Sequence, residues 1–293
     1  MSPIQKGEPI TLEPNIRAAL PGDVAQVLAG GVQYVTPGGM VWHGFGPVDA
    51  PALILLHGGS GSWTHWVRNI APWVAKGRRV LVPDLPGFGD SAAPPSGWDA
   101  DAMVAPLQQG FLALKQNEQT DVVGFSFGAM TAALWLAQHP GVAKQLVMVG
   151  APGLGLTVPD RVALKAWRHL RTAPEQEAAH RHNLLTLMLH KPERLDALAM
   201  AVHTGNVVRD RMLRRRLSQT LIVAETLPLL PCMVHVIYGE FDALYRGRLN
   251  EVQALMRQTV PRWGSWQVIG GAGHWVQFEA PEAFHEALTQ ALL

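Results

Sequence analysis

Short, nearly continuous apolar runs recur along most of the chain, at residues 52–56, 79–83, 121–123, 146–149, 233–238 and 266–269. Segments long enough for helices lie between them. Strands that are buried on both faces are apolar throughout, and helix-length connections usually join parallel strands. The pattern therefore predicts an α/β fold with a mostly parallel central sheet and helices on both faces.

Two regions depart from this alternation. Residues 23–45 alternate between apolar and polar positions and contain Gly-Gly and Pro-Gly pairs, which predicts antiparallel strands joined by tight turns. Residues 153–227 show helical periodicity without a convincing strand, and the helices are expected at 160–172, 175–190, 192–204 and 207–225. We therefore expect a core domain, residues 1–152 and 228–293, that is interrupted by a helical insertion, residues 153–227.

Composition limits the classes of partner. The chain has 293 residues, of which 48% are hydrophobic, and a formal net charge of +1, so no overall field attracts it to nucleic acid or to an anionic membrane. No apolar run approaches the length of about 18 residues that spans a bilayer. We therefore expect a small-molecule substrate, with neither nucleic acid nor a membrane as partner. The oligomeric state is left open, a homo-oligomer included.

The single cysteine and the N-terminus bear on the compartment. One cysteine, Cys232, excludes an internal disulfide framework and fits a reducing compartment. The first 15 residues contain no apolar segment of the kind found in secretory signals. Both features favour a cytoplasmic location, and Cys232 itself is expected to be a small buried hydrophobe beside a core strand.

The strongest chemical signal is GFSFG at residues 124–128, between an apolar run and a helix-like stretch at 129–138. In such a G-x-S-x-G turn the chain passes from strand to helix so tightly that the serine backbone is strained, and a Cβ at either glycine would clash. The turn holds the Oγ of Ser126 clear of the sheet. It also places the N–H of Phe127 at a helix N-terminus, where it can stabilise an oxyanion.

Two polar residues follow later apolar runs. Asp242 ends GEFD directly after the run at 233–238, and His274 ends GGAGH after the run at 266–269. A serine hydroxyl needs a base within hydrogen-bond reach, which a histidine supplies while a carboxylate fixes its tautomer. The chain order Ser126, Asp242, His274 is the order found in α/β-hydrolases.

Two further stretches resemble the α/β-hydrolase family. LILLHGGSGSWTHW at 53–66 is similar to the buried strand and His-Gly turn that present a second oxyanion N–H, which would here come from Gly59. VLVPDLPGFGDS at 80–91 is similar to the next core strand and its loop. The resemblance covers about residues 30–152 and about 228 to the C-terminus. It implies an α/β-hydrolase fold in which the insertion is a cap over the active site.

The resemblance also implies a reaction through a serine acyl-enzyme, with no cofactor. A carboxylic ester hydrolase is the first interpretation, and Ser126 argues against haloalkane dehalogenases and epoxide hydrolases, whose nucleophile is an aspartate. The alternative is a carbon–carbon bond hydrolase of ring-fission diketones. It is favoured by GHWVQFEAPEAF at 273–284 and disfavoured by GGSGS at 58–62, where those enzymes have a GGGPG-type loop. A slow-turnover ligand receptor of the same fold is a third interpretation.

Several residues near the motifs have two interpretations. Glu240 lies two residues from Asp242 and is the alternative triad acid. His57 and Asp84 are expected to brace loops, with catalysis as the alternative. The candidates for an apolar substrate pocket, each equally explained by core packing, are Trp63, Phe125 and Trp275.

Charge is divided unevenly along the chain. The insertion holds 12 of the 24 Lys and Arg residues and 7 of the 23 Asp and Glu residues, which gives it about +5 and the core about −4. The simple interpretation is a solvated basic face that includes Arg214, Arg215 and Arg216. In the other, a cation pairs with an anionic substrate group, and the candidates are Arg161, Arg168, Arg209 and Arg211.

The histidines give no metal signal. None of the twelve shows a paired ligand spacing, so no metal is expected. His180, His182 and Asn183 in the insertion are expected at the surface, and a position facing the active site is the alternative.

Overall fold

The computed structural model describes residues 7–114, 120–156 and 162–292. A single sheet of nine strands has the order β1-β2-β3-β5-β4-β6-β7-β8-β9. The strands are β1 (Glu8–Pro9), β2 (Val32–Thr36), β3 (Met40–Phe45), β4 (Ala52–Leu56), β5 (Arg79–Pro83), β6 (Thr120–Phe125), β7 (Ala143–Val149), β8 (Met233–Gly239) and β9 (Trp263–Ile269). Strands β1, β2, β3 and β5 pair antiparallel, whereas all pairs from β5 across to β9 are parallel. The six apolar runs of the sequence are the strands β4 to β9, as predicted.

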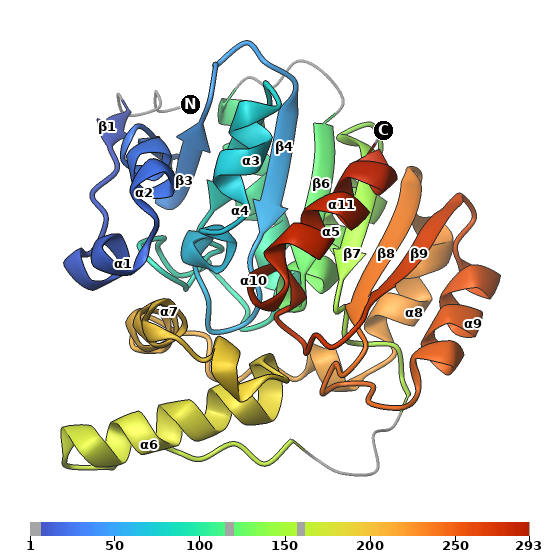
Figure 1. Ribbon diagram of the computed structural model, residues 1–293. Coiled ribbons are helices and arrows are strands. Elements are labelled where there is room, and N and C mark those ends of the chain that lie inside the picture. The colour runs from blue at the N-terminus through green and yellow to red at the C-terminus, as the bar shows by residue number, and fades with distance from the viewer. Residues whose placement is uncertain (1–6, 115–119, 157–161, 293) are drawn as a thin grey trace.

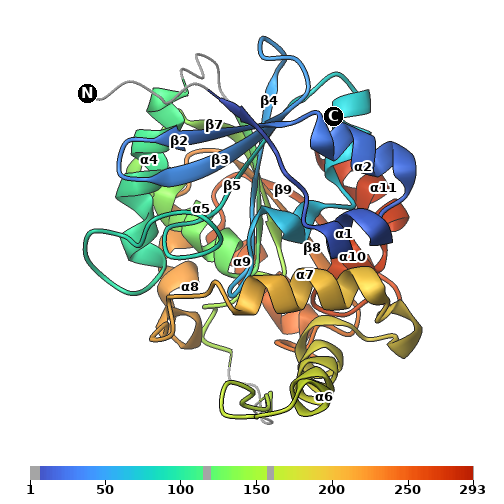
Figure 2. The same ribbon diagram turned by 90° about the vertical axis from the view of Figure 1, so that its left-hand side faces the viewer.

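Helices cover both faces of this sheet (Figure 1). They are α1 (Pro14–Ala19), α2 (Gly22–Ala29), α3 (Ile70–Ala75), α4 (Val104–Ala113), α5 (Phe127–Gln138), α6 (Ala173–Asn183), α7 (Ala197–Val207), α8 (Ile222–Thr226), α9 (Leu249–Thr259), α10 (Val276–Glu279) and α11 (Pro281–Leu292). In Figures 1 and 2, α6 and α7 lie beyond the end of the sheet at which β4 ends.

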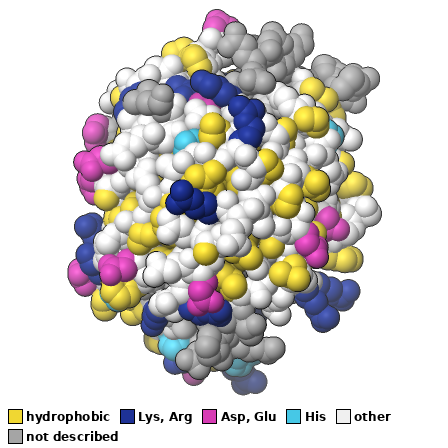
Figure 3. Space-filling model, turned by 90° about the vertical axis from the view of Figure 1, so that its right-hand side faces the viewer, with side chains coloured by type: hydrophobic (Ala, Val, Ile, Leu, Met, Phe, Trp, Pro, Cys, Tyr) yellow, Lys and Arg dark blue, Asp and Glu magenta, His cyan; other side chains and the backbone are white. Residues whose placement is uncertain are grey.

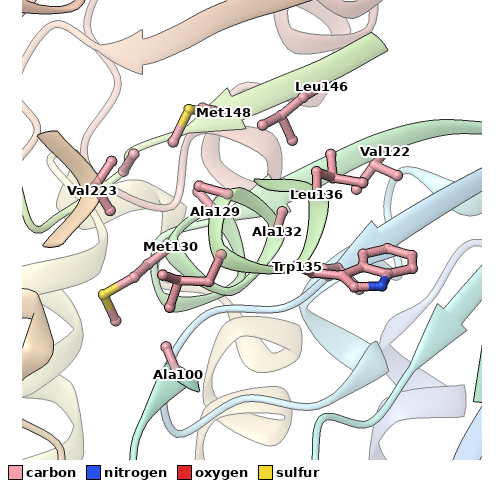
Figure 4. Close-up of a cluster of buried hydrophobic side chains, with 14 of the residues drawn as sticks. Ala100, Val122, Ala129, Met130, Ala132, Trp135, Leu136, Leu146, Met148 and Val223 are labelled. Carbon is pink, nitrogen blue, oxygen red and sulfur yellow. The ribbon is translucent and has the colours of Figure 1, made fainter. Parts of the chain in front are cut away.

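Two hydrophobic cores lie on opposite faces of the sheet because successive side chains of a strand point to opposite sides. In β4, Ile54 and Leu56 belong to the core under α4, α5, α8 and α9, whereas Leu53 and Leu55 belong to the core under α3 and α11. Helix α5 is buried almost all round. Figure 4 shows its Ala129 and Ala132 beside Met148 of β7, where small side chains let the helix lie close to the sheet.

The N-terminal region differs in part from the prediction. Residues 32–45 form the expected antiparallel hairpin of β2 and β3. Residues 22–29, however, form the helix α2, because Val24 and Leu28 are four residues apart and both pack into the core under α3 and α11.

The first predicted helix of the insertion, 160–172, is absent from the part that the structure describes, residues 162–172. The side chains of α6 bind this backbone instead. Asn183 accepts from the N–H of Lys165 and donates to its C=O, and His182 donates to the C=O of Ala163. These three backbone groups, which a helix would pair internally, are satisfied by α6, which lowers the cost of an irregular path.

The last predicted helix, 207–225, is also wrong as a single element. Helix α7 ends at Val207 and α8 begins only at Ile222, with one short 3₁₀ turn between them. Backbone N–H groups of the segment between these helices donate to core residues instead. The N–H of Arg211 donates to the C=O of Gly87, and the N–H groups of Arg216 and Leu217 donate to the carboxylate of Asp99. Helical periodicity in the sequence gave no sign of these contacts.

No helix among the described residues has the length and apolar character needed to cross a bilayer. On the face that carries α9 and β9, basic, acidic and apolar side chains are interspersed (Figure 3). This mixture fits the near-neutral charge of the chain.

Candidate active site

Ser126 lies on a strained turn between β6 and α5. Its backbone has φ 51° and ψ −115°, a conformation that side chains rarely adopt. A Cβ on Gly124 would lie 2.5 Å from the C=O oxygen of Gly128, and one on Gly128 would lie 2.4 Å from that of Leu56. The predicted need for two glycines around a strained serine is therefore confirmed.

The structure brings Ser126, His274 and Asp242 together in one hydrogen-bonded chain. The Nε2 of His274 is 2.9 Å from the Oγ of Ser126, and its Nδ1 is 2.8 Å from the Oδ2 of Asp242. Since a carboxylate only accepts, Nδ1 carries the proton and Nε2 is free to accept from the serine hydroxyl. Asp242 is completely buried and His274 nearly so. The arrangement can remove a proton from Ser126 and hold the resulting imidazolium against a carboxylate.

Gly150, at the end of β7, permits this close grouping. It has φ 56°, and a Cβ there would lie 3.0 Å from the His274 ring and 3.1 Å from the Oδ2 of Asp242. Gly150 was not among the predicted site residues, although a glycine directly after a core strand is a signal for such a position.

The alternative residues have other partners. Glu240 is exposed and accepts from the N–H of Gly271 at 2.8 Å, outside the hydrogen-bonded chain. Asp84 accepts from the N–H of Trp63 at 2.8 Å and from that of Asp90 at 2.9 Å. Its contacts are therefore those of a brace between two loops, as expected.

His57 also braces a loop. Its Nδ1 donates to the C=O of Gly58 at 2.8 Å and its Nε2 accepts from the N–H of Leu85 at 2.8 Å. Burial lowers the pKa of His57, so the ring is neutral. Both of its ring nitrogens are occupied by these two hydrogen bonds.

The glycine loop, residues 58–62, lies against the elbow. A Cβ on Gly58 would be 3.3 Å from the Cβ of Ser126, and one on Gly59 would be 3.7 Å from the Cβ of Phe127. Neither Gly59 nor Phe127 donates its N–H to any described residue outside the regular helices and strands. Gly59 and Phe127, whose N–H groups are predicted to form an oxyanion hole, thus lie next to each other in space and beside Ser126.

A buried ion pair joins the insertion to the glycine loop. Arg215 donates to both carboxylate oxygens of Asp210 at 2.9–3.1 Å and to the Oγ of Ser60 at 3.1 Å, and Ser60 in turn donates to Asp210 at 2.5 Å. Burial alone would raise the pKa of Asp210, but Arg215 and Ser60 outweigh it and hold that pKa below its usual value. The Arg215 guanidinium also lies over the rings of Phe88 and Phe127. Arg215 is therefore no part of a solvated face.

Replacing Arg215 with alanine is expected to lower the free energy of unfolding by about 3 kcal/mol, because it leaves the Asp210 carboxylate buried without its cation. Urea denaturation measures this. Arg214→Ala is the matched control, since Arg214 lies over the exposed Trp98 ring and its loss should cost less than about 0.5 kcal/mol. Equal effects of the two changes would contradict the prediction.

The three aromatic residues expected to bind substrate lie in different surroundings. Phe125 has its ring centroid 5.0 Å from that of His274, and Trp275 has its own 4.9 Å from that of His65. Trp63, by contrast, stacks on His43 at 4.9 Å and packs near Phe45. The contacts of Trp63 are those of core packing, so its selection for the pocket rested on sequence proximity alone.

The cations selected in the insertion are engaged elsewhere. Arg168 donates to the C=O of Val207, Arg209 pairs with Glu13 and Asp90, and Arg211 donates to a set of backbone carbonyls in residues 88–91 and 209. Arg161 lies outside the described residues. The described members of the group are held by a helix end and by loops.

One buried and one half-buried histidine of the insertion, His180 and His203, lie where the sequence did not predict them. His180, expected at the surface, is only 4% exposed, with its ring 5.2 Å from that of His203. Asn183, also expected at the surface, is buried and binds residue 165, whereas the more exposed His182 binds residue 163. Burial, and then His180, lowers the pKa of His203 to about 4. The side of α6 that carries His180 therefore faces α7.

Stability is expected to fall as the pH is lowered from 6.5 toward about 4. Within this window the unfolded chain binds a proton at His203 that the folded chain excludes. The contribution of neutral His203 to the free energy of unfolding is therefore complete above pH 6.5 and is lost as the pH falls toward about 4. His203→Gln should reduce the loss between pH 7 and pH 4.5 by up to about 3 kcal/mol, as measured by urea denaturation at both pH values. His182→Gln, at a more exposed position, is the control, and an equal reduction by both would contradict the prediction.

Glu279 on α10 holds the loop of His274 against the insertion. Its buried carboxylate accepts from the N–H groups of Gly273 at 2.6 Å, His190 at 2.8 Å and Lys191 at 2.6 Å. The N–H of Trp275 also donates to the C=O of Met188. The loop carrying His274 is therefore fixed from both the core and the insertion.

In the described part of the chain, no group of three or more His, Cys, Asp or Glu side chains has the arrangement of a metal site. Cys232 is 3% exposed, and burial raises the pKa of its thiol to about 11. It is the small buried hydrophobe that was predicted.

Comparisons with known proteins agree with this fold. Residues 51–224 match the family model described as alpha/beta hydrolase fold. A 2-hydroxy-6-oxo-6-phenylhexa-2,4-dienoate hydrolase of Burkholderia cepacia is 25% identical over 246 residues, which are 80% of this chain and 85% of that protein. An sn-1-specific diacylglycerol lipase of Mus musculus is 28% identical over 260 residues, 84% of this chain and 82% of the lipase. Among solved structures, an esterase from Rhodococcus sp. ECU1013 has a TM-score of 0.68 at 22% identity, covering 88% of this chain and 97% of the esterase.

Proposed function

Since the chain belongs to the alpha/beta hydrolase fold family, whose members similar to it are hydrolases, we propose that it hydrolyses a carboxylic ester or related acyl bond of a small, partly apolar substrate. One observation carries the proposal. Ser126, on its strained turn, is hydrogen-bonded to His274 at 2.9 Å, and His274 is hydrogen-bonded to the buried Asp242 at 2.8 Å.

In the first half of the proposed reaction, the Oγ of Ser126 attacks the acyl carbon while its proton passes to the Nε2 of His274. The negative oxygen of the tetrahedral intermediate accepts from the N–H groups of Gly59 and Phe127. His274 then protonates the departing alcohol oxygen, and the acyl group stays on Ser126.

In the second half, His274 takes a proton from a water molecule, whose oxygen attacks the acyl-enzyme. The same N–H groups stabilise the second tetrahedral intermediate. Its collapse releases the carboxylic acid and returns the proton to Ser126. Asp242 keeps the imidazole in the required tautomer throughout and stabilises its charged form. In this scheme the insertion is a cap that shapes the pocket and excludes bulk water.

Hydrolysis of a carbon–carbon bond is the second candidate. The dienoate hydrolase relative is named for a substrate that contains keto and carboxylate groups and no ester. The segment at 273–284 resembles the corresponding segment of such enzymes. The two chemistries share the nucleophile and differ in the leaving group, which is an alcohol oxygen in one and a carbon in the other.

A parallel assay separates the candidates. Purified protein is incubated with p-nitrophenyl butanoate and, separately, with a vinylogous 1,5-diketone, and product formation is followed by absorbance. The ester hydrolase proposal predicts a kcat/KM for the ester at least about 10-fold above that for the diketone, the equivalent of about 1.4 kcal/mol. The reverse ranking supports the carbon–carbon bond hydrolase, and turnover of neither rejects both.

A further inference from the structure

A row of polar side chains leads from the candidate triad into the insertion. His65 begins it: its ring centroid lies 5.7 Å from that of Phe125, which lies 5.0 Å from that of His274. Thr64, the neighbour of His65 in the chain, donates to Asn206 of α7 at 3.1 Å, so the turn that carries His65 lies against the helix that carries His203. His180, with its ring 5.2 Å from that of His203, ends the row.

Asn206 fixes the orientation of α7 in this row. Its side-chain oxygen, Oδ1, accepts hydrogen bonds from two core hydroxyls, the Oγ of Ser62 at 2.7 Å and the Oγ1 of Thr64 at 3.1 Å. His203 precedes Asn206 by three residues and therefore lies on the same side of the helix. That side of α7 faces the core next to the glycine loop.

Four buried nitrogens of the row have no hydrogen-bond partner among the described residues: Nδ1 of His65, Nδ1 of His180, Nε2 of His203 and Nδ2 of Asn206. A buried polar group without a partner is costly, and folded proteins pair nearly all such groups. Three of these atoms lie on the insertion helices α6 and α7, and the fourth lies on the core turn that α7 contacts.

The histidines of this row are uncharged at neutral pH. Burial lowers the pKa of His180, and it lowers that of His203 to about 4. A neutral imidazole offers one donor and one acceptor, which suits a hydroxyl, keto or amide group. A carboxylate in the same place would be buried without a cation, which is far more costly. The three described arginines that were candidates for an anionic substrate group, Arg168, Arg209 and Arg211, are engaged with other residues of the chain.

We propose that His65, His180, His203 and Asn206 form a subsite that binds an uncharged hydrogen-bonding group on the part of the substrate remote from the scissile bond. The inference rests on the proposed ester hydrolysis and defines its substrate class. The preferred substrates are esters that carry a keto, hydroxyl or amide group, rather than a second carboxylate.

Matched esters of one chain length test the subsite. We would measure kcat/KM at pH 7.5 for the p-nitrophenyl esters of heptanoic acid and of 4-oxo-, 5-oxo- and 6-oxoheptanoic acid, and for the half-ester of adipic acid. The last two differ only in a terminal methyl group or negative oxygen. At least one oxo ester should exceed heptanoate by about 10-fold, and the adipate half-ester should fall below every oxo ester.

Two substitutions on one helix provide the matched control. His180→Phe removes the hydrogen-bonding ring from the row and should reduce the ratio of oxo ester to heptanoate by about 5-fold or more, through KM. His182→Phe, two residues away and outside the row, should leave the ratio unchanged. His203→Phe is a second test at a different helix, so the result does not depend on one variant folding.

Each outcome decides between the two proposals. If heptanoate is hydrolysed but the oxo esters gain nothing, or if the adipate half-ester is preferred, the subsite is wrong while the ester hydrolase stands. The subsite is equally wrong if neither His180→Phe nor His203→Phe changes the ratio, in which case water alone pairs the four nitrogens. If no ester is hydrolysed, the proposed function fails and the subsite fails with it.

Discussion

Replacement of Ser126 with alanine is expected to reduce kcat by about 10⁶-fold, because no other group in the site can take over the attack on the acyl carbon. Its backbone, already strained at φ 51°, keeps the same path in the variant, since alanine differs only by the missing oxygen. Circular dichroism and thermal unfolding should therefore match the parent protein. Single-turnover and steady-state assays with an aryl ester measure the loss.

A fluorophosphonate probe supplies the control for this variant. It should label the parent protein at Ser126 and leave Ser126→Ala unlabelled, as read by peptide mass spectrometry. Ser60 and Ser62 in the glycine loop donate their hydroxyls to Asp210 and Asn206, and Ser91 donates to the C=O of Asp84. Labelling of any of these three, with activity retained in Ser126→Ala, would refute the assignment of the nucleophile.

Replacement of Asp242 with asparagine is expected to reduce kcat by about 10⁴-fold with little change in KM. The amide can donate to Nδ1, which favours the imidazole tautomer whose Nε2 carries the proton and cannot accept from Ser126. The geometry stays the same while the proton is on the wrong nitrogen. Raising the pH should not restore the rate, because the tautomer and not the total charge is at fault.

Glu240→Gln is the matched control for this second change. Glu240 lies two residues from Asp242 and its carboxylate accepts from the N–H of Gly271 on the loop that leads to His274. Its loss should lower kcat by less than about 10-fold, the equivalent of about 1.4 kcal/mol. A larger loss for Glu240→Gln than for Asp242→Asn would show that the acid had been misassigned.

The fold and the hydrogen-bonded chain of the site were predictable because their signals are local. An apolar run of three to six residues marks each of the strands β4 to β9, and the residues of the candidate triad, at 126, 242 and 274, follow such runs within five residues. The carboxyl ends of neighbouring parallel strands meet at one edge, so position along the chain already implies proximity in space. The catalytic roles of these residues stay predictions until the variants are measured.

The contacts of the insertion were not predictable because they depend on how it lies on the core. Arg215 and Arg214 are neighbours in a basic run, yet one is paired with buried Asp210 and the other lies over exposed Trp98. His180 and His182 differ in the same way. The predicted helices at 160–172 and 207–225 failed because other segments bind their backbone groups, which periodicity does not reveal.

Glu279 limits how this chain can be shortened or recombined. Two of its three donors, His190 and Lys191, belong to the insertion, so a deletion of residues 153–227 would leave the buried carboxylate with one donor, the N–H of Gly273. The donors are backbone N–H groups, so the requirement falls on the course of the chain and not on side-chain identity. A segment transplanted from a relative would therefore have to bring two consecutive N–H groups to the same point, whereas its pocket-facing residues are free to differ. Chimeras that keep the contact between Glu279 and these two N–H groups should fold. In chimeras that break it, the loop that carries His274 should lose its fixed position.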